Sequence, residues 1–434
     1  MGRKPVHLVF VEEKDKGDGV DHNKFYDMFE RNGECHCLYG RRQDGYEFGT
    51  SGSLSVKPLS DWDKIYNSKV GKGYEDKSYL YEDLVTTETV GKASDTSLYA
   101  PISNPKIASI VDRLQKYANE VIKANYSVKA GQVTQIMVDE TQRYIDELAN
   151  CAEINDLDRF NYLLQESFKI ISRSMRTVDK CLVRPNNPEW YKYMENPVKY
   201  LKSVVQREQD LLDVMRGQII TPVRGQKVKT VKGDKKTILE LNGITFEEAT
   251  AEDIELVKNK LGSNANRLKN VWKVSNEKQT KAYMSYCEAE GLRKRDCKLL
   301  WHGTRNENLW NILKTGLVLR PTNVKIQGKM FGYGIYFAPS AQKSLGYTSL
   351  SGSYWAGGSS PSGFMILHAV AYGKPYVVDS FNSKYYDFNY ATLRRTCSGA
   401  HCLHADSSKG MLRNDEIVVY KEEQIMPLYL VEIG

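Results

Sequence analysis

The sequence predicts an α+β protein with several domains: a small β-rich domain, an all-α helical bundle and a mixed α/β domain. Three observations support this fold class. Short apolar runs separated by turn residues fill residues 1–92, which is the pattern of a small sheet. Apolar stripes at helical spacing fill residues 104–220, and apolar strands alternate with single helices over residues 237–434. The length of 434 residues suggests about three domains.

Composition narrows the class of protein. Hydrophobic residues make up 41% of the chain and charged residues 26%, which is ordinary for a globular protein. No apolar run approaches the ~20 residues that span a bilayer, and the N-terminal apolar run is too short for a signal peptide. The eight cysteines are scattered, which favours reduced thiols inside a cell. We therefore expect no membrane partner, while the net charge of +7 permits nucleic acid without requiring it.

The first part, residues 1–92, is predicted to form a basic sheet with one helix. Strands are expected at residues 7–11, 24–29 and 37–42, with a further candidate at 46–49, and a helix is expected at 59–70. Basic and aromatic residues interleave here, with Tyr39 and Arg41 close together. On composition alone, these charges are best explained as a solvated surface.

The second part, residues 104–220, is predicted to be a helical bundle between two linkers at 93–103 and 221–236. Asn104 and Pro105 are the residue types that cap a helix and begin its first turn. Four apolar stripes predict four helices. The stripes begin near residues 107, 133, 157 and 201.

The third part, residues 237–434, contains the stretch with the strongest chemical signal. A buried strand at 299–301 is expected to end on His302, and a short helix is expected to stop at Gly316. A strand at 330–337 carries Tyr336 and has glycines at alternate positions, where a backbone or a flat ligand can approach closely. His302 and Tyr336 should therefore face a cleft. The other elements expected are strands at 238–241, 268–274, 364–372, 416–420 and 426–433, and a helix at 251–261.

Two common kinds of site are disfavoured. No G-x-G-x-x-G opens a helix and the P-loop pattern is absent, so a dinucleotide would have to bind in another way. A dense cluster in this part has a spacing that fits no common zinc finger, and we expect no metal. Its members are Cys397, His401, Cys402 and His404.

Three motifs, LLWHGT, MFGYGIYFAPSAQKS and NDEIVVY, occur in the order seen in the catalytic domain of poly(ADP-ribose) polymerases, which this part resembles. The His-Tyr-Glu signature of that family falls on His302, Tyr336 and Glu416. The resemblance implies an ADP-ribosyltransferase fold with split antiparallel sheets. It also implies NAD+ as the substrate, no required metal, and transfer of ADP-ribose to acceptor proteins that include the enzyme itself.

The resemblance implies catalytic roles for the three signature residues. Glu416 would bind the 2′-hydroxyl of the reacting ribose and orient the attacking hydroxyl, and His302 would hold the ribose on the adenosine side. Tyr336, with Tyr347 on the other side, would stack on nicotinamide. Taken singly, each has a commoner explanation as an exposed carboxylate, a core histidine or a core aromatic. The other NAD-binding residues implied are Gly303, Thr304, Asn308, Arg320 and Ser344.

Two positions depart from the family pattern. Val318 stands where the family has an arginine, and Arg320 is the candidate to replace it. Pro339 stands where an aspartate often follows, which puts one adenosine contact in question.

The first part resembles a WGR domain, the DNA-break-sensing module of the same family, with Tyr39 in place of its tryptophan and Arg41 as the arginine. The helical part corresponds in position to the family's helical regulatory domain. The resemblance thus implies a DNA-break-stimulated poly(ADP-ribose) polymerase, similar to the DNA-dependent members without N-terminal zinc fingers. It would be nuclear in a eukaryote and otherwise intracellular. A mono-ADP-ribosyltransferase, or a DNA-binding scaffold with an inactive catalytic fold, remains the alternative.

Overall fold

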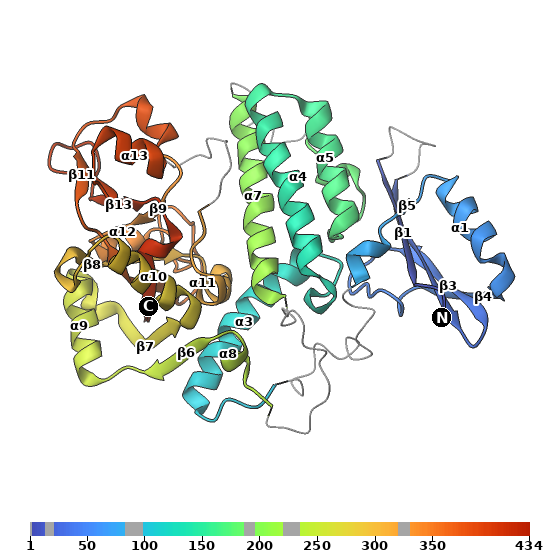
Figure 1. Ribbon diagram of the computed structural model, residues 1–434, viewed down its shortest axis with the longest axis horizontal. Coiled ribbons are helices and arrows are strands. Elements are labelled where there is room, and N and C mark those ends of the chain that lie inside the picture. Colours follow the sequence, from blue (N-terminus) through green and yellow to red (C-terminus); the bar gives the residue numbers. More distant parts are fainter. Residues whose placement is uncertain (1, 14–20, 83–98, 186–195, 220–234, 320–329) are drawn as a thin grey trace. The chain divides into compact units, whose positions relative to one another are not determined.

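The computed structural model describes residues 2–13, 21–82, 99–185, 196–219, 235–319 and 330–434 (Figure 1). Contacts group the chain into two compact units: Met1–Thr96 with Asn119–Gly233, and Ser97–Ala118 with Asp234–Gly434, called unit 1 and unit 2 below. The predicted linkers at 93–103 and 221–236 lie mostly outside the described residues. Within the described ranges, no helix is long and apolar enough to cross a membrane.

Unit 1 contains a five-stranded sheet in the order β4-β3-β2-β1-β5. Its strands are β1 (Val6–Glu12), β2 (His22–Arg31), β3 (Glu34–Arg41), β4 (Ser53–Pro58) and β5 (Glu75–Asp76). The three strands predicted first and the helix α1 (Trp62–Val70) are confirmed. β4 was missed because it is an edge strand whose apolar residues Leu54 and Val56 are exposed, so it lacks a buried apolar face.

The helices of unit 1 include α4 (Gln135–Ile154), α5 (Leu157–Ile170) and α7 (Pro197–Gln218), which lie side by side (Figure 1). Each begins at a capping side chain. Thr134, Asp156 and Asn196 accept hydrogen bonds from the backbone N–H groups three residues ahead. These caps and the buried apolar stripes confirm three of the four predicted helices.

The fourth predicted helix is α3 (Pro105–Asn125), and its first half contributes to the core of unit 2. Asn104 caps it by accepting from Lys106 N at 2.9 Å. The buried residues of its first half pack in one cluster with Trp272 and Phe364. Arg113 lies over the Phe364 ring and pairs with Glu432 at 2.7 Å. The members of this stripe are Ile107, Ile110, Val111 and Leu114. The grouping by contacts therefore assigns the two parts of α3 to different units. The boundaries of the three domains expected from the sequence stay a prediction.

Unit 2 is built on two sheets. The first has the order β6-β7-β14-β10-β8 and is antiparallel throughout. The second has the order β11-β12-β13-β9, in which only β11 and β12 are parallel. This confirms a mixed α/β unit with antiparallel sheets. The strands are β6 (Ile244–Glu248), β7 (Leu268–Asn276), β8 (Cys297–Thr304), β9 (Ile335–Phe337), β10 (Gly363–Ala371), β11 (Pro375–Val378), β12 (Cys402–Ala405), β13 (Glu416–Val419) and β14 (Ile425–Ile433).

The two sheets of unit 2 meet at the edge strands β8 and β9. Trp301 N donates to Ala338 O at 2.9 Å, and Ala338 N donates to Trp301 O at 3.0 Å. Trp301 is completely buried. This bridge sets His302, the next residue of β8, beside Tyr336 in the middle of β9.

Three sequence predictions of local structure were wrong. Residues 238–241 form the helix α8 (Ile238–Leu241), because Thr237 and Glu240 make a capping box. Residues 330–337 contain only the short strand β9, since Tyr333 N donates to Phe388 O and turns the backbone away. Residues 46–49 form no strand, because Tyr46 N donates to Ser127 O instead of entering the sheet.

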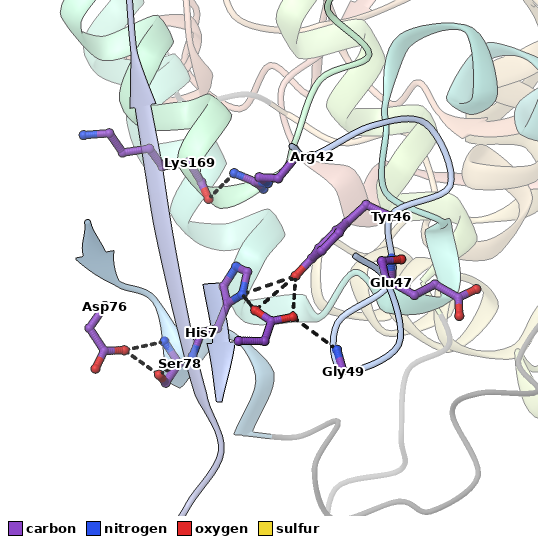
Figure 2. Close-up of polar contacts among 10 residues, drawn as sticks. His7, Arg42, Tyr46, Glu47, Gly49, Asp76, Ser78 and Lys169 are labelled. Atoms are coloured by element: carbon purple, nitrogen blue, oxygen red, sulfur yellow. Dashed lines mark hydrogen bonds and ion pairs between the residues drawn. The ribbon is translucent and has the colours of Figure 1, made fainter. Parts of the chain in front are cut away.

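Two sets of buried polar contacts fix the sheet of unit 1, one within residues 7–49 and one to the helix α5 (Figure 2). Asp27 is completely buried and lies 2.6 Å from His7 Nδ1, and it accepts from the Tyr46 hydroxyl at 3.2 Å and from Gly49 N at 3.3 Å. Arg42 donates to the carbonyls of Phe168 and Lys169 in the last turn of α5. Because cations favour the C-terminal end of a helix, Arg42 both neutralises that end and fixes the end of β3.

Candidate active site

His302 lies on β8 opposite Ile366 of β10, at the edge of the first sheet. Its Nδ1–H donates to the Tyr336 carbonyl at 3.1 Å, which leaves Nε2 as the acceptor of the neutral ring. Burial lowers the pKa of His302, and the hydrogen bond to Tyr336 offsets only part of this shift. A neutral imidazole with a free Nε2 can accept a hydrogen bond from a sugar hydroxyl.

Tyr336 lies on β9 and has its ring fixed by the preceding turn. Its hydroxyl donates to Gly332 O and accepts from Phe331 N, both at 3.0 Å. Burial raises the pKa of Tyr336 well above its usual value, and the negative charge of Glu416 adds to this. Tyr336 is therefore a neutral ring in a fixed position, and its strand pairs with β13, which begins at Glu416.

Glu416 is the first residue of β13, one position before the pair Ile417 and Phe337. This register places it at the Ala338 end of β9, where the two sheets meet. Lys343 Nζ lies 2.7 Å from Glu416 Oε1, and both side chains are largely buried, at 14% and 13% exposed. Lys343 also donates to Asn414 O at 3.3 Å.

Lys343 is a site residue that sequence reasoning did not assign, although it stands beside Ser344 in the quoted motif. Its partner Glu416 is on a different strand far along the chain, so no spacing pattern links the two. Lys343 lies on the short helix that follows β9 and Glu416 begins β13, so the pairing of β9 with β13 brings the two segments together. The ion pair is made through Oε1 and fixes the direction of the carboxylate.

Gly303, Ser344 and Tyr347 complete the nicotinamide side of the predicted site. A Cβ on Gly303 would lie 1.9 Å from Ser344 O, so only glycine permits this approach of the two backbones. Ser344 is buried and donates from its hydroxyl to Trp301 O at 3.2 Å. Burial raises the pKa of Tyr347, and the negative charge of Glu416 adds to this shift.

The adenosine-side predictions are only partly placed. Thr304 Oγ1 accepts from Asn308 Nδ2 at 3.2 Å, just before the helix α11 (Leu309–Thr315), which ends before Gly316 as predicted. Arg320 lies outside the described residues. Val318, which stands where the family has an arginine, is described and partly exposed.

The residue before Glu416 is held by a chain of hydrogen bonds that sequence reasoning missed. The Tyr372 hydroxyl and His404 Nδ1 are 2.8 Å apart, and His404 Nε2 lies 2.9 Å from Asp415 Oδ2. Ser407 donates to Asp415 Oδ1 from both its N–H and its hydroxyl. Burial raises the pKa of Asp415, but the bonds from Ser407 and His404 outweigh it and lower that pKa to about 2. The Asp415 carboxylate is therefore ionised throughout the neutral range.

This chain of hydrogen bonds includes one member of the Cys/His cluster noted in the sequence. His404 faces Asp415, whereas His401 accepts from Lys374 N at 3.0 Å and Cys402 donates to Tyr372 O at 3.2 Å. Across the described ranges, no group of three or more His, Cys, Asp or Glu side chains is arranged to hold a metal ion.

We expect Asp415→Asn to slow the ADP-ribose transfer that the resemblance implies more than it weakens NAD+ binding. The amide keeps the size of the side chain but loses the charge-assisted bonds from His404 and Ser407, which are worth about 1.5–3 kcal/mol each to a charged group. Glu416 would then be less well oriented. Asp406→Asn is the matched control, because Asp406 accepts from Ser408 N and has no recorded bond to His404. The rate of transfer from labelled NAD+ and the NAD+ affinity are the measurements, and equal loss in both variants would contradict this role.

Comparison with known proteins agrees with this geometry. Residues 251–434 match the poly(ADP-ribose) polymerase catalytic domain. The poly [ADP-ribose] polymerase-like protein 100L of Invertebrate iridescent virus 6 is 32% identical over 139 residues, which is 31% of this chain and 70% of that protein. The poly [ADP-ribose] polymerase of Drosophila melanogaster is 30% identical over 164 residues, 38% of this chain and 15% of that protein. The protein mono-ADP-ribosyltransferase PARP3 of Gallus gallus is 33% identical over 137 residues, 31% of this chain and 23% of that protein.

With this match and the site geometry, the chain belongs to the poly(ADP-ribose) polymerase family. It is an ADP-ribosyltransferase whose substrate is NAD+. The reaction breaks the bond between nicotinamide and ribose, with positive charge developing on the sugar, and a fixed carboxylate stabilises such charge. In the described part of the chain, Glu416 is a largely buried carboxylate that is held by Lys343, and its strand pairs with the strand of Tyr336.

Proposed function

We propose that this protein is a poly(ADP-ribose) polymerase that is stimulated by DNA breaks, transfers ADP-ribose to acceptor proteins including itself, and elongates the chain. The observation that carries the proposal is the placement of Glu416. Its carboxylate is held by Lys343 at 2.7 Å, at the start of the strand β13 that pairs with the strand of Tyr336. A carboxylate fixed beside the reacting sugar can both stabilise the cation and orient an incoming ribose hydroxyl, which is what elongation requires.

Addition of a single ADP-ribose unit is the second candidate. The PARP3 relative from Gallus gallus is named as a mono-ADP-ribosyltransferase, and it is about as similar to this chain as the relatives named as polymerases. Incubation with labelled NAD+, with and without nicked DNA, separates the two. A ladder that grows with nicked DNA supports the proposal, and a single modified band in both lanes supports mono-ADP-ribosylation.

A basic aromatic surface on unit 1 supports the DNA part of the proposal. Tyr39 is 41% exposed at the end of β3 and stacks on Tyr26 with ring centroids 5.7 Å apart. Lys69 Nζ lies 4.0 Å from the centroid of the Tyr26 ring. Burial lowers the pKa of Lys69, and the nearby charge of Lys72 lowers it further. Arg41 has a side chain 40% exposed, with Asp21 at 3.4 Å. Such a surface can bind the phosphates and the flat bases of a DNA end. In a eukaryotic cell, we propose that the protein is located in the nucleus.

We expect Tyr39→Ala and Arg41→Ala each to weaken binding to a nicked duplex. Loss of a stacking ring costs about 1–3 kcal/mol, and loss of a phosphate contact should also flatten the salt dependence. Arg159→Ala is the charge-matched control, because Arg159 lies on α5 and pairs with Glu147. Fluorescence anisotropy at several salt concentrations measures these effects. If wild type and both variants bind alike, the DNA role of this surface is refuted.

A further inference from the structure

Two large aromatic side chains are exposed on the loop between the helix α12 (Ala341–Leu345) and β10. Tyr354 is 81% exposed and Trp355 is 64% exposed. Trp355 N and Ala356 N both donate to Gly346 O, at 2.8 and 3.0 Å. Two strand-like bonds between Ser351, Ser360 and Ser349 close the loop farther out. The backbone thus ties this loop directly to the residue before Tyr347.

The side chain of Trp355 packs against Tyr347. The two rings are stacked, with centroids 6.1 Å apart and planes 18° from parallel, within the range of favourable offset stacking. A Cβ on Gly346 would come within 2.8 Å of Trp355 Cδ1. The indole therefore occupies the space that a side chain at position 346 would fill. Backbone bonds, ring stacking and this close approach all place Trp355 against the same segment.

We propose that Trp355 is a positioning residue for the nicotinamide half of NAD+. It covers one face of the Tyr347 ring and supports that ring, so that the other face is held for the flat nicotinamide. This inference rests on the proposed role of Tyr347. Without the indole, Tyr347, already 41% exposed, would lose its packing partner and sample other rotamers. Part of the free energy of ligand binding would then be spent on ordering the ring.

Tyr354 provides the matched control within the same loop. Its ring meets Trp355 edge-on, at 4.7 Å between centroids and 89° between planes, and it has no recorded ring contact with Tyr347. Trp355→Ala and Tyr354→Ala each remove one exposed aromatic ring from the loop. Only Trp355→Ala removes the partner of Tyr347, so a difference between the two variants reports on that stacking contact.

The test uses the full chain, with benzamide as a flat amide probe of the nicotinamide site and NAD+ as the substrate. We expect Trp355→Ala to raise the inhibition constant of benzamide and the KM for NAD+ by roughly two- to tenfold, the range expected for one aromatic pair. kcat should change less than KM, because the stacked ring is bound before and during bond cleavage. Trp355→Phe should restore most of the affinity, and Tyr354→Ala should leave it unchanged.

A second comparison separates the failure of this inference from the failure of the proposed site. If Tyr347→Ala does not affect benzamide, the assignment of Tyr347 is wrong and the inference falls with it. If Tyr347→Ala weakens benzamide but Trp355→Ala leaves it unchanged or tightens it, the inference alone is overturned. If Trp355 acts through Tyr347, the Trp355→Ala change should have no further effect in the Tyr347→Ala background.

Discussion

Glu416→Gln should reduce chain elongation by about two to three orders of magnitude, the usual effect of removing one group that stabilises charge in the transition state. The glutamine keeps the size and hydrogen-bonding capacity of the side chain but removes its charge. Since that charge matters most when the sugar becomes cationic, the affinity for NAD+ should change little. Product length from labelled NAD+, together with NAD+ binding by calorimetry, measures the two effects separately.

The ion pair with Lys343 makes this result interpretable. In the variant, Lys343 Nζ still has Asn414 O at 3.3 Å as an acceptor, so the ammonium group does not lose its last partner. We therefore expect the melting temperature to fall by only a few degrees, as for a loss of about 1 kcal/mol. Glu423→Gln is the control, because Glu423 is an exposed carboxylate close behind β13. Polymer of wild-type length from Glu416→Gln would disprove the assignment.

The second large effect is expected on removal of unit 1. The family resemblance implies that the helical part restrains the catalytic part until DNA binds, which requires two states whose balance DNA shifts. A variant that joins 97–118 to 234–434 through a flexible linker keeps every residue of unit 2. It should be active without DNA, well above the basal level of the full chain, and DNA should not stimulate it further.

The first half of α3 decides how this experiment must be designed. A deletion of the whole helical part would remove four buried side chains that pack with Trp272 and Phe364, at about 2–5 kcal/mol for each large side chain lost. It would also leave Glu432 without Arg113. We therefore expect residues 234–434 alone to misfold or aggregate, which circular dichroism and thermal unfolding will show. The side chains lost are Ile107, Ile110, Val111 and Leu114.

The joined variant tests whether unit 1 restrains the activity of unit 2. Basal activity equal to that of the full chain without DNA, in a variant shown to be folded, would mean that unit 1 does not restrain unit 2. A folded but inactive 234–434 would instead show that the α3 half is needed for activity. DNA stimulation of the joined variant would place a DNA site in unit 2, contrary to the role proposed for Tyr39 and Arg41.

The sequence by itself determined most of the elements and the three signature positions. Helices such as α5 are specified locally, because their caps and apolar stripes lie within the segment that folds. The same holds for α11 with its stop at Gly316. Local sequence patterns gave a wrong prediction where a distant segment contacts the backbone. At residues 330–337, a hydrogen bond from Tyr333 N to Phe388 O takes the place of strand pairing. The patterns also failed at α8, where the capping box was not recognised.

Tertiary structure alone decided which residues meet. Lys343 reaches Glu416, and His404 reaches Asp415, only because β9, β12 and β13 pair in one register. The division of α3, whose first half packs with unit 2, follows from burial against distant strands. Helix and strand patterns are periodic in sequence and can be recognised there, whereas contacts between distant segments leave no such period. That is why the sequence could predict Glu416 but not the lysine that orients it.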